Sequence, residues 1–155
     1  VNEHVARAGA NQIAFVMGPD DTKVELLQIS AIDYPIRLHH VHWATQHGEE
    51  MQAWYARYLG VTPGVRIGQP AGELPGVNLT FGPSTEPTVP TRGRALDHIG
   101  FEVKNLEEFC KRLEAMGIVL DTPYTPLPEL GAAMAFLTDP WGTRIELHEG
   151  LVNVR

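Results

Sequence analysis

The sequence feature that most constrains the fold is an internal repeat of a strand–helix pattern. When His40 is superposed on His98, Gly60 falls within one residue of Gly117, and each pair encloses an apolar strand followed by an amphipathic helix. A repeat of this length indicates a duplicated supersecondary unit whose two copies share a core. We interpret each copy as a β-α-β-β-β unit, which predicts an α+β fold of paired βαβββ modules.

Local signals place the two helices. Residues 49–59 carry apolar side chains at helical spacing, and Gly60 is in the position that commonly ends a helix. In the second copy, Asn105 is a typical N-cap, and Glu108 completes a capping-box pattern three residues later. Gly117 is expected to end this helix.

Prolines shape the expected connections. Residues 61–72 are predicted to hold one strand, which Pro63 and Pro70 interrupt. A loop is predicted around Pro123, Pro126 and Pro128.

The N-terminal segment resembles the end of the second copy. Residues 13–27 read as a hairpin around a Gly-Pro-Asp-Asp turn. Five of its positions align without gaps with the C-terminal hairpin: Phe15, Pro19, Thr22, Glu25 and Leu26 match Phe136, Pro140, Thr143, Glu146 and Leu147. We therefore divide the chain into a partial third module (1–29), a linker (30–36), a first module (37–93) and a second module (94–150).

Charge and composition exclude several classes of partner. The net charge is -7 and no Lys/Arg cluster stands out, so neither nucleic acid nor a membrane is expected as a partner. The single cysteine, Cys110, rules out an internal disulfide and is expected to be a buried structural thiol. No apolar run has the length of a membrane span. The sequence does not distinguish a cytoplasmic protein from one that is exported and loses a leader.

Metal-capable side chains stand in three otherwise apolar strands. His98 and Glu146 lie in two of them, and the segment 38–43 adds three histidines. A buried lone carboxylate is costly, so Glu146 needs a partner, and a metal ion is the obvious one. Each residue also has an explanation without a metal. His98 could be a core histidine satisfied by hydrogen bonds, and Glu146 could face water from an edge strand.

Three segments carry a resemblance to a known family. Residues 96–101 (Leu-Asp-His-Ile-Gly-Phe), the turn 139–142 (Asp-Pro-Trp-Gly) and residues 144–147 (Arg-Ile-Glu-Leu) resemble the vicinal oxygen chelate superfamily. Its members include glyoxalase I, fosfomycin-resistance proteins, extradiol dioxygenases, methylmalonyl-CoA epimerase and bleomycin-resistance proteins. The resemblance covers residues 37–149, extends in part to 11–28, and implies a curved mixed sheet around a metal cleft.

The resemblance also implies a ligand set. By position, the family's metal ligands fall on His40, Asn78, His98 and Glu146. Asn78 departs from the family's Glu or Gln, and an amide oxygen is a weak ligand, so Asn78 is expected to contact substrate or bound water. The remaining ligands, His40, His98 and Glu146, suit Fe(II), Mn(II), Ni(II), Co(II) or Zn(II) with open positions for a substrate.

Two further histidines share faces with these ligands. His42 lies on the His40 face of its strand, where it would touch substrate or support a ligand. His148 lies on the Glu146 face of its strand, and Glu146 and His148 are the candidates for acid–base catalysis. For His148 the alternatives are support of a ligand and a plain surface position.

The resemblance implies a metal-dependent enzyme for a small oxygen-chelating substrate, with lyase, isomerase, thiol transferase or dioxygenase chemistry. Phe136 stands where extradiol dioxygenases carry Tyr, which argues against catechol ring cleavage. The alternatives are a metal-free binding protein of the bleomycin-resistance type and a structural module. Because such modules often pair across chains, a homodimer is expected.

Overall fold

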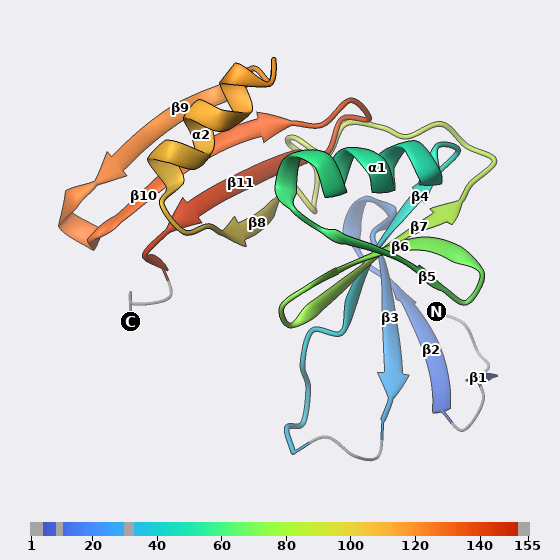
Figure 1. The fold of residues 1–155 in the computed structure, drawn as a ribbon. Coiled ribbons are helices and arrows are strands. Elements are labelled where there is room, and N and C mark those ends of the chain that lie inside the picture. The colour runs from blue at the N-terminus through green and yellow to red at the C-terminus, as the bar shows by residue number, and fades with distance from the viewer. Residues whose placement is uncertain (1–4, 9–10, 30–32, 152–155) are drawn as a thin grey trace. The chain divides into compact units, whose positions relative to one another are not determined.

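The chain divides into two compact units in a computed structural model that describes residues 5–8, 11–29 and 33–151 (Figure 1). One unit comprises residues 1–37 and 93–96, and the other comprises residues 38–92 and 97–155.

The smaller unit is a three-stranded antiparallel sheet of strands β1 (Ala6–Ala8), β2 (Asn11–Met17) and β3 (Lys23–Gln28), in that order. The turn between β2 and β3 contains a short 3-10 segment, Pro19–Asp21. The hairpin predicted for residues 13–27 is thereby confirmed.

The larger unit begins with a complete βαβββ module. Its elements are β4 (His40–Thr45), α1 (Gly48–Leu59), β5 (Thr62–Arg66), β6 (Gln69–Leu74) and β7 (Val77–Pro83). The strand order is β4-β7-β6-β5, with β4 and β7 parallel and the other pairs antiparallel.

The second module repeats this topology. Its elements are β8 (Ile99–Glu102), α2 (Leu106–Ala115), β9 (Leu120–Leu127), β10 (Ala132–Thr138) and β11 (Arg144–Glu149). The strand order β8-β11-β10-β9, with β8 and β11 parallel, matches the first module strand for strand. The predicted α+β fold of paired βαβββ modules is therefore confirmed.

One hydrophobic core serves both modules. Trp43, Tyr55 and Phe81 from the first module belong to the same buried cluster as Leu113 and Leu147 from the second. Cys110 is also buried there, as its apolar helix position predicted. Burying such large side chains contributes roughly 1.5–3 kcal/mol each, so the modules stabilise each other.

Two side-chain hydrogen bonds cross this core. Tyr55 Oη on α1 donates to Asp139 Oδ2 (3.0 Å), and Trp43 Nε1 on β4 donates to Thr143 Oγ1 (3.0 Å). Burial raises the pKa of Tyr55 well above its ordinary value, and the negative charge of Asp139 adds a smaller rise. The phenol therefore stays protonated and keeps its donor role.

The proline-based predictions were wrong in two places. Residues 61–72 form parts of two strands, β5 and β6, which reverse at Ile67 and Gly68, both at positive φ (49° and 73°). Strand β9 runs through Pro123 and Pro126, where a loop was expected. Strands β5 and β9 are sheet edges, where a missing N–H need not break a ladder bond.

The predicted cap of α2 was also wrong. Asn105 adopts a left-handed conformation (φ 54°) and its side chain makes no capping hydrogen bond. The Glu149 carboxylate accepts hydrogen bonds from the backbone N–H groups of Asn105 (2.8 Å) and Leu106 (3.1 Å). A carboxylate at this end also interacts favourably with the helix dipole, so Glu149 replaces the expected local cap.

We expect Glu149→Ala to lower the free energy of unfolding by about 1 kcal/mol, the usual loss for a missing helix cap. Asn105→Gly is the matched control, because glycine adopts positive φ without strain and no side-chain cap is lost. Urea unfolding monitored by circular dichroism measures both. Equal losses for the two variants would contradict Glu149 as the cap.

Gly142 is required by the turn between β10 and β11. Its φ is 92°, and a Cβ there would lie 2.9 Å from Pro90 Cα. We expect Gly142→Ala to destabilise the protein by about 2–4 kcal/mol, from backbone strain plus a clash with backbone. Gly76 has a similar φ (83°) but open space around it. Gly76→Ala should therefore lose only the stability that backbone strain costs. Thermal unfolding measures both variants, and an equal fall in melting temperature would contradict the clash at Gly142.

Candidate functional site

His98 and Glu146 meet on the face of the second module's sheet that lies opposite the core. Glu146 on β11 is directly opposite Gly100 on the parallel strand β8, and His98 immediately precedes β8. His98 Nε2 lies 3.2 Å from Glu146 Oε2, and the two side chains are 37% and 20% exposed. The strand neighbours Ile145 and Leu147 point into the core. Strand alternation thus holds an imidazole and a carboxylate together where a solute can reach them.

Gly100 leaves space beside this pair. A Cβ at Gly100 would lie 3.3 Å from His148 Nε2 and 3.5 Å from Glu146 Oε2. His148 Nδ1 contacts Glu102 Oε2 (2.6 Å), and Glu102 Oε1 accepts from the backbone N–H of Gly150 (2.7 Å). Nε2 is therefore the ring atom of His148 that lines the same space as Glu146.

The sequence reasoning missed Glu102, although a signal was present. His98, Gly100 and Glu102 follow one another at a spacing of two residues, which puts them on one face of a strand. The register confirms this, because Glu102 is opposite His148.

A second carboxylate lies on the other side of His98. Asp97 Oδ1 contacts His98 Nδ1 (2.9 Å) and accepts from Arg144 Nη1 (2.7 Å). The Arg144 guanidinium lies 4.3 Å from the centre of the Phe136 ring, and the His98 ring meets the same ring edge-on at 5.6 Å. Phe136 is opposite Glu146 in the sheet and forms an apolar wall of the site.

His40 and His42 lie on the corresponding face of the first module. In the parallel pair of β4 and β7, His40 is opposite Asn78 and His42 is opposite Thr80. The His40 and His42 rings meet edge-on at 4.6 Å between centroids. Among the described residues, His40 does not join His98 and Glu146 in one group of three close ligand atoms. The structure thus brings two of the three predicted ligands together within a chain.

Asn78 is held by neighbours within its own module. It is 4% exposed, and its Nδ2 donates to the Glu73 carboxylate and to the carbonyl oxygen of Gly72 (3.3 Å). Its Oδ1 accepts from Thr80 Oγ1 (2.9 Å). The predicted contact of Asn78 with substrate or bound water stays a prediction.

The donor set around His98 suits a divalent transition metal. Imidazole nitrogen and carboxylate oxygen are ligands that Fe(II), Mn(II), Ni(II), Co(II) and Zn(II) accept. Within the network described above, Asp97, Glu102 and Glu146 bring three carboxylates against one guanidinium, Arg144. This excess of acidic groups favours a cation beside Glu146.

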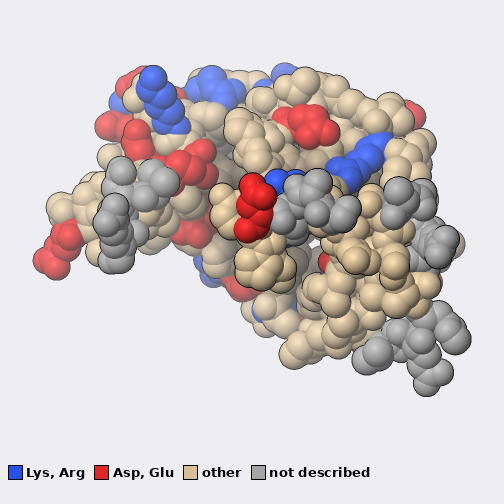
Figure 2. Space-filling view, turned by 90° about the horizontal axis from the view of Figure 1, so that it is seen from below, with Lys and Arg blue, Asp and Glu red and all other residues tan. Residues whose placement is uncertain are grey.

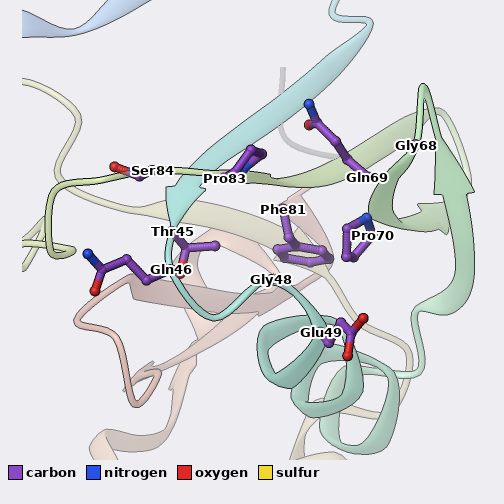
Figure 3. A pocket seen from close by; sticks show the side chains of 10 residues that line it. All are labelled: Thr45, Gln46, Gly48, Glu49, Gly68, Gln69, Pro70, Phe81, Pro83 and Ser84. Atoms are coloured by element: carbon purple, nitrogen blue, oxygen red, sulfur yellow. The ribbon is translucent and has the colours of Figure 1, made fainter.

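A separate pocket of about 390 Å³ lies in the first module, beside the start of α1 (Figure 3). Thr45, Glu49, Gln69 and Phe81 are among its lining residues, and the predicted metal ligands are not. This pocket is therefore distinct from the His98–Glu146 pair.

Lys and Arg side chains are scattered among acidic ones on the face shown in Figure 2, and the described residues there form no continuous basic patch. Neither described helix is long and apolar enough to cross a membrane.

Comparison with family models identifies the family of this chain. A family model described as the glyoxalase/bleomycin resistance protein/dioxygenase superfamily matches residues 37–147. Among curated proteins, none matches the sequence significantly.

Solved structures with the same fold include a lactoylglutathione lyase from Agrobacterium tumefaciens (18% identity, 76% of this chain and 96% of that chain, TM-score 0.58). The oxidase ChaP-H2 is similar at 21% identity, over 75% of this chain and 94% of that chain, with a TM-score of 0.58. TioX from Micromonospora sp. ML1 matches at 16% identity, over 74% and 98% of the two chains, with a TM-score of 0.57.

Proposed function

Because the chain belongs to the glyoxalase/bleomycin resistance protein/dioxygenase superfamily, we propose that it is a divalent-metal-dependent enzyme for a small substrate that chelates through two oxygens. The observation that carries this proposal is the His98–Glu146 pair, with 3.2 Å between Nε2 and Oε2 on an accessible sheet face. A protein that only sequestered a ligand would not need this pairing of ligand-type side chains.

In this proposal His98 Nε2 and Glu146 Oε2 supply two metal ligands. His40 supplies the third from a second copy of the chain, since one copy does not group His40 with the other two among its described residues. The enzyme is accordingly proposed to be a homodimer, in which Asn78 and His42 contribute substrate contacts from the His40 face.

When bound, the metal would act as a Lewis acid on the substrate oxygens. His148 is proposed to move a proton at its Nε2, while Glu102 holds its Nδ1 and fixes the ring orientation. Glu146 would serve as both ligand and proton acceptor, and Phe136, opposite Glu146 in the sheet, would exclude water from one side of the site.

Two local features narrow the proposed chemistry. Phe136 beside His98 has no hydroxyl to bond a catecholate, which disfavours ring-cleaving dioxygenase activity. Arg144 is paired with Asp97, so it is already partly neutralised and is a poor anchor for a phosphonate. We therefore place isomerase or lyase chemistry of the glyoxalase type ahead of ring cleavage and thiol transfer to fosfomycin.

The test begins with elemental analysis of protein purified without chelator. Titration with Fe(II), Mn(II), Ni(II), Co(II) and Zn(II) follows, and then an activity screen with hemithioacetals, catechols, fosfomycin and acyl-CoA esters. We expect bound metal and turnover of a hemithioacetal or an acyl-CoA ester. Protein that holds no metal and takes up none of the five would instead be a metal-free binding protein of the bleomycin-resistance type.

A further inference from the structure

We propose that Asp97 is the positioning residue of the metal ligand His98, and that Arg144 holds Asp97 in place. The inference rests on the proposed function, because it assigns a role toward the metal that His98 would bind. It adds residues that the ligand pattern of the sequence did not include.

Asp97 sets which nitrogen of His98 faces the metal. Its Oδ1 lies 2.9 Å from His98 Nδ1, at the opposite end of the ring from Nε2, which faces Glu146. A carboxylate only accepts hydrogen bonds, and Asp97 is closer to the ring than Glu146 (2.9 Å against 3.2 Å), so the ring proton of a neutral imidazole is favoured on Nδ1. Nε2 then carries the lone pair, which is the state that ligates a metal.

Arg144 keeps Asp97 in this position. Its Nη1 donates to the same Oδ1 atom at 2.7 Å, and its guanidinium is stacked over Phe136 at 4.3 Å. The Thr91 hydroxyl also joins the two residues through their backbones, because it donates to the Asp97 carbonyl oxygen (2.8 Å) and accepts from the Arg144 N–H (2.9 Å). The carboxylate is thus fixed by contacts to both side chain and backbone.

The network also couples the two ligands to each other. Arg144 lies two residues before Glu146 on β11, and Asp97 directly precedes His98. The contact of Asp97 with Arg144 therefore ties the segment that carries His98 to the strand that carries Glu146. Such outer partners typically change metal affinity by about 10–100-fold when they are removed.

The first readout needs no metal. Long-range proton–nitrogen NMR of histidine-labelled, metal-free protein in mildly alkaline buffer reports the tautomer of His98. We expect Nδ1–H in the wild type and in Asp97→Asn, whose amide oxygen still accepts, and a shift toward Nε2–H in Asp97→Ala. Asp121→Ala is the matched control, since Asp121 is bonded to Thr138 in the same sheet and not to a histidine.

The second readout is the dissociation constant for Mn(II) or Zn(II) measured by calorimetry. We expect affinity to fall about 10–100-fold in Asp97→Ala, less in Asp97→Asn, and not at all in Asp121→Ala. Arg144→Gln separates orientation from charge. If Asp97 acted only through its negative charge, losing the neighbouring cation would strengthen metal binding, whereas loss of orientation weakens it.

The outcomes distinguish the two proposals. Wild-type metal affinity and an unchanged His98 tautomer in Asp97→Ala would overturn the positioning role and leave the proposed function standing. Stronger metal binding by Arg144→Gln would likewise reject orientation in favour of charge. A folded wild-type protein that binds no metal would contradict the proposed function, and the positioning role with it.

Discussion

Asp139→Ala is expected to lower the free energy of unfolding by about 3 kcal/mol or more. Asp139 is 3% exposed and accepts three hydrogen bonds: from Trp141 N (2.9 Å), Thr143 N (2.7 Å) and Tyr55 Oη (3.0 Å). Alanine would leave these donors without their acceptor, and a buried donor without a partner costs about 1–3 kcal/mol. Because Tyr55 belongs to the first module, the loss would loosen both modules.

Urea unfolding measures this effect, and two variants serve as controls. Asp139→Asn keeps the side-chain shape and an acceptor for the two backbone groups, so we expect a smaller loss. Tyr55→Phe removes one donor and should cost about 1 kcal/mol. A double-mutant cycle of these two changes isolates the bond between the modules. A loss within about 0.5 kcal/mol for Asp139→Ala, the range of ordinary surface changes, would contradict the argument.

The same carboxyl predicts a pH dependence. Burial raises the pKa of Asp139 above its ordinary value of 3.8, although hydrogen bonds from Thr143, Tyr55 and Trp141 oppose the rise. The folded state therefore holds this proton more tightly than the unfolded state. The resulting stability is fully present below pH 3.8 and is lost as the pH rises through the folded-state pKa. The unfolding free energy of the wild type minus that of Asp139→Asn should fall across this window, and a rise would contradict it.

The second large effect concerns metal binding. His98→Ala and Glu146→Gln are each expected to weaken binding of a divalent metal by more than the 10–100-fold typical of outer partners, because each removes a proposed ligand. Both side chains are partly exposed, so the fold should survive their replacement. Metal content after gel filtration and calorimetric titration measure the loss. Full metal stoichiometry in His98→Ala would reject the site.

The origin of the third ligand has its own test. If His40 comes from a second copy, unfolding and refolding a mixture of His40→Ala and His98→Ala chains restores intact sites in hybrid dimers. Random pairing restores about one quarter of the wild-type number, since half of the dimers are hybrid and each has one intact site. Each variant alone should bind metal far more weakly than the wild type, and a mixture that shows no gain over the separate variants would reject the shared site.

Short-range patterns predicted much of this fold. The apolar spacing of residues 49–59 identified α1, and Gly60 ends it in the left-handed conformation (φ 75°) that favours glycine. The alternation that put His42 on the face of His40 is observed in β4, where the intervening Trp43 is buried. The repeat of His40 on His98 correctly predicted that two modules share one topology. Each of these depends on neighbours within a few residues or on copying a local pattern.

Features that depend on tertiary position were missed. Whether Pro123 breaks a strand depends on whether that strand is an edge, and β9 is one. Glu149 caps a helix that begins 43 residues before it, so no local signature could reveal the cap. Which ligands join His40 also depends on contacts beyond the local sequence, and its grouping with His98 and Glu146 stays a prediction.

For the site itself, the two-residue periodicity of strands predicted part of the arrangement. It put Glu146 and His148 on one face, and the parallel pairing of β8 with β11 then brought His98 to Glu146. The role of Asp97 could not be predicted, because strand alternation points adjacent residues to opposite faces. Asp97 reaches His98 Nδ1 because it lies before β8 begins.

The prolines of the edge strands limit how copies of this chain can associate. Pro63 in β5 and Pro123 and Pro126 in β9 remove backbone donors from one outer edge of each sheet, which makes these edges poor templates for an added strand. In the homodimer proposed above, continuation of either sheet by a second copy would therefore use the opposite edges, β4 and β8. Strand β4 carries His40 and β8 directly follows His98, so this way of associating would bring the two histidines toward each other.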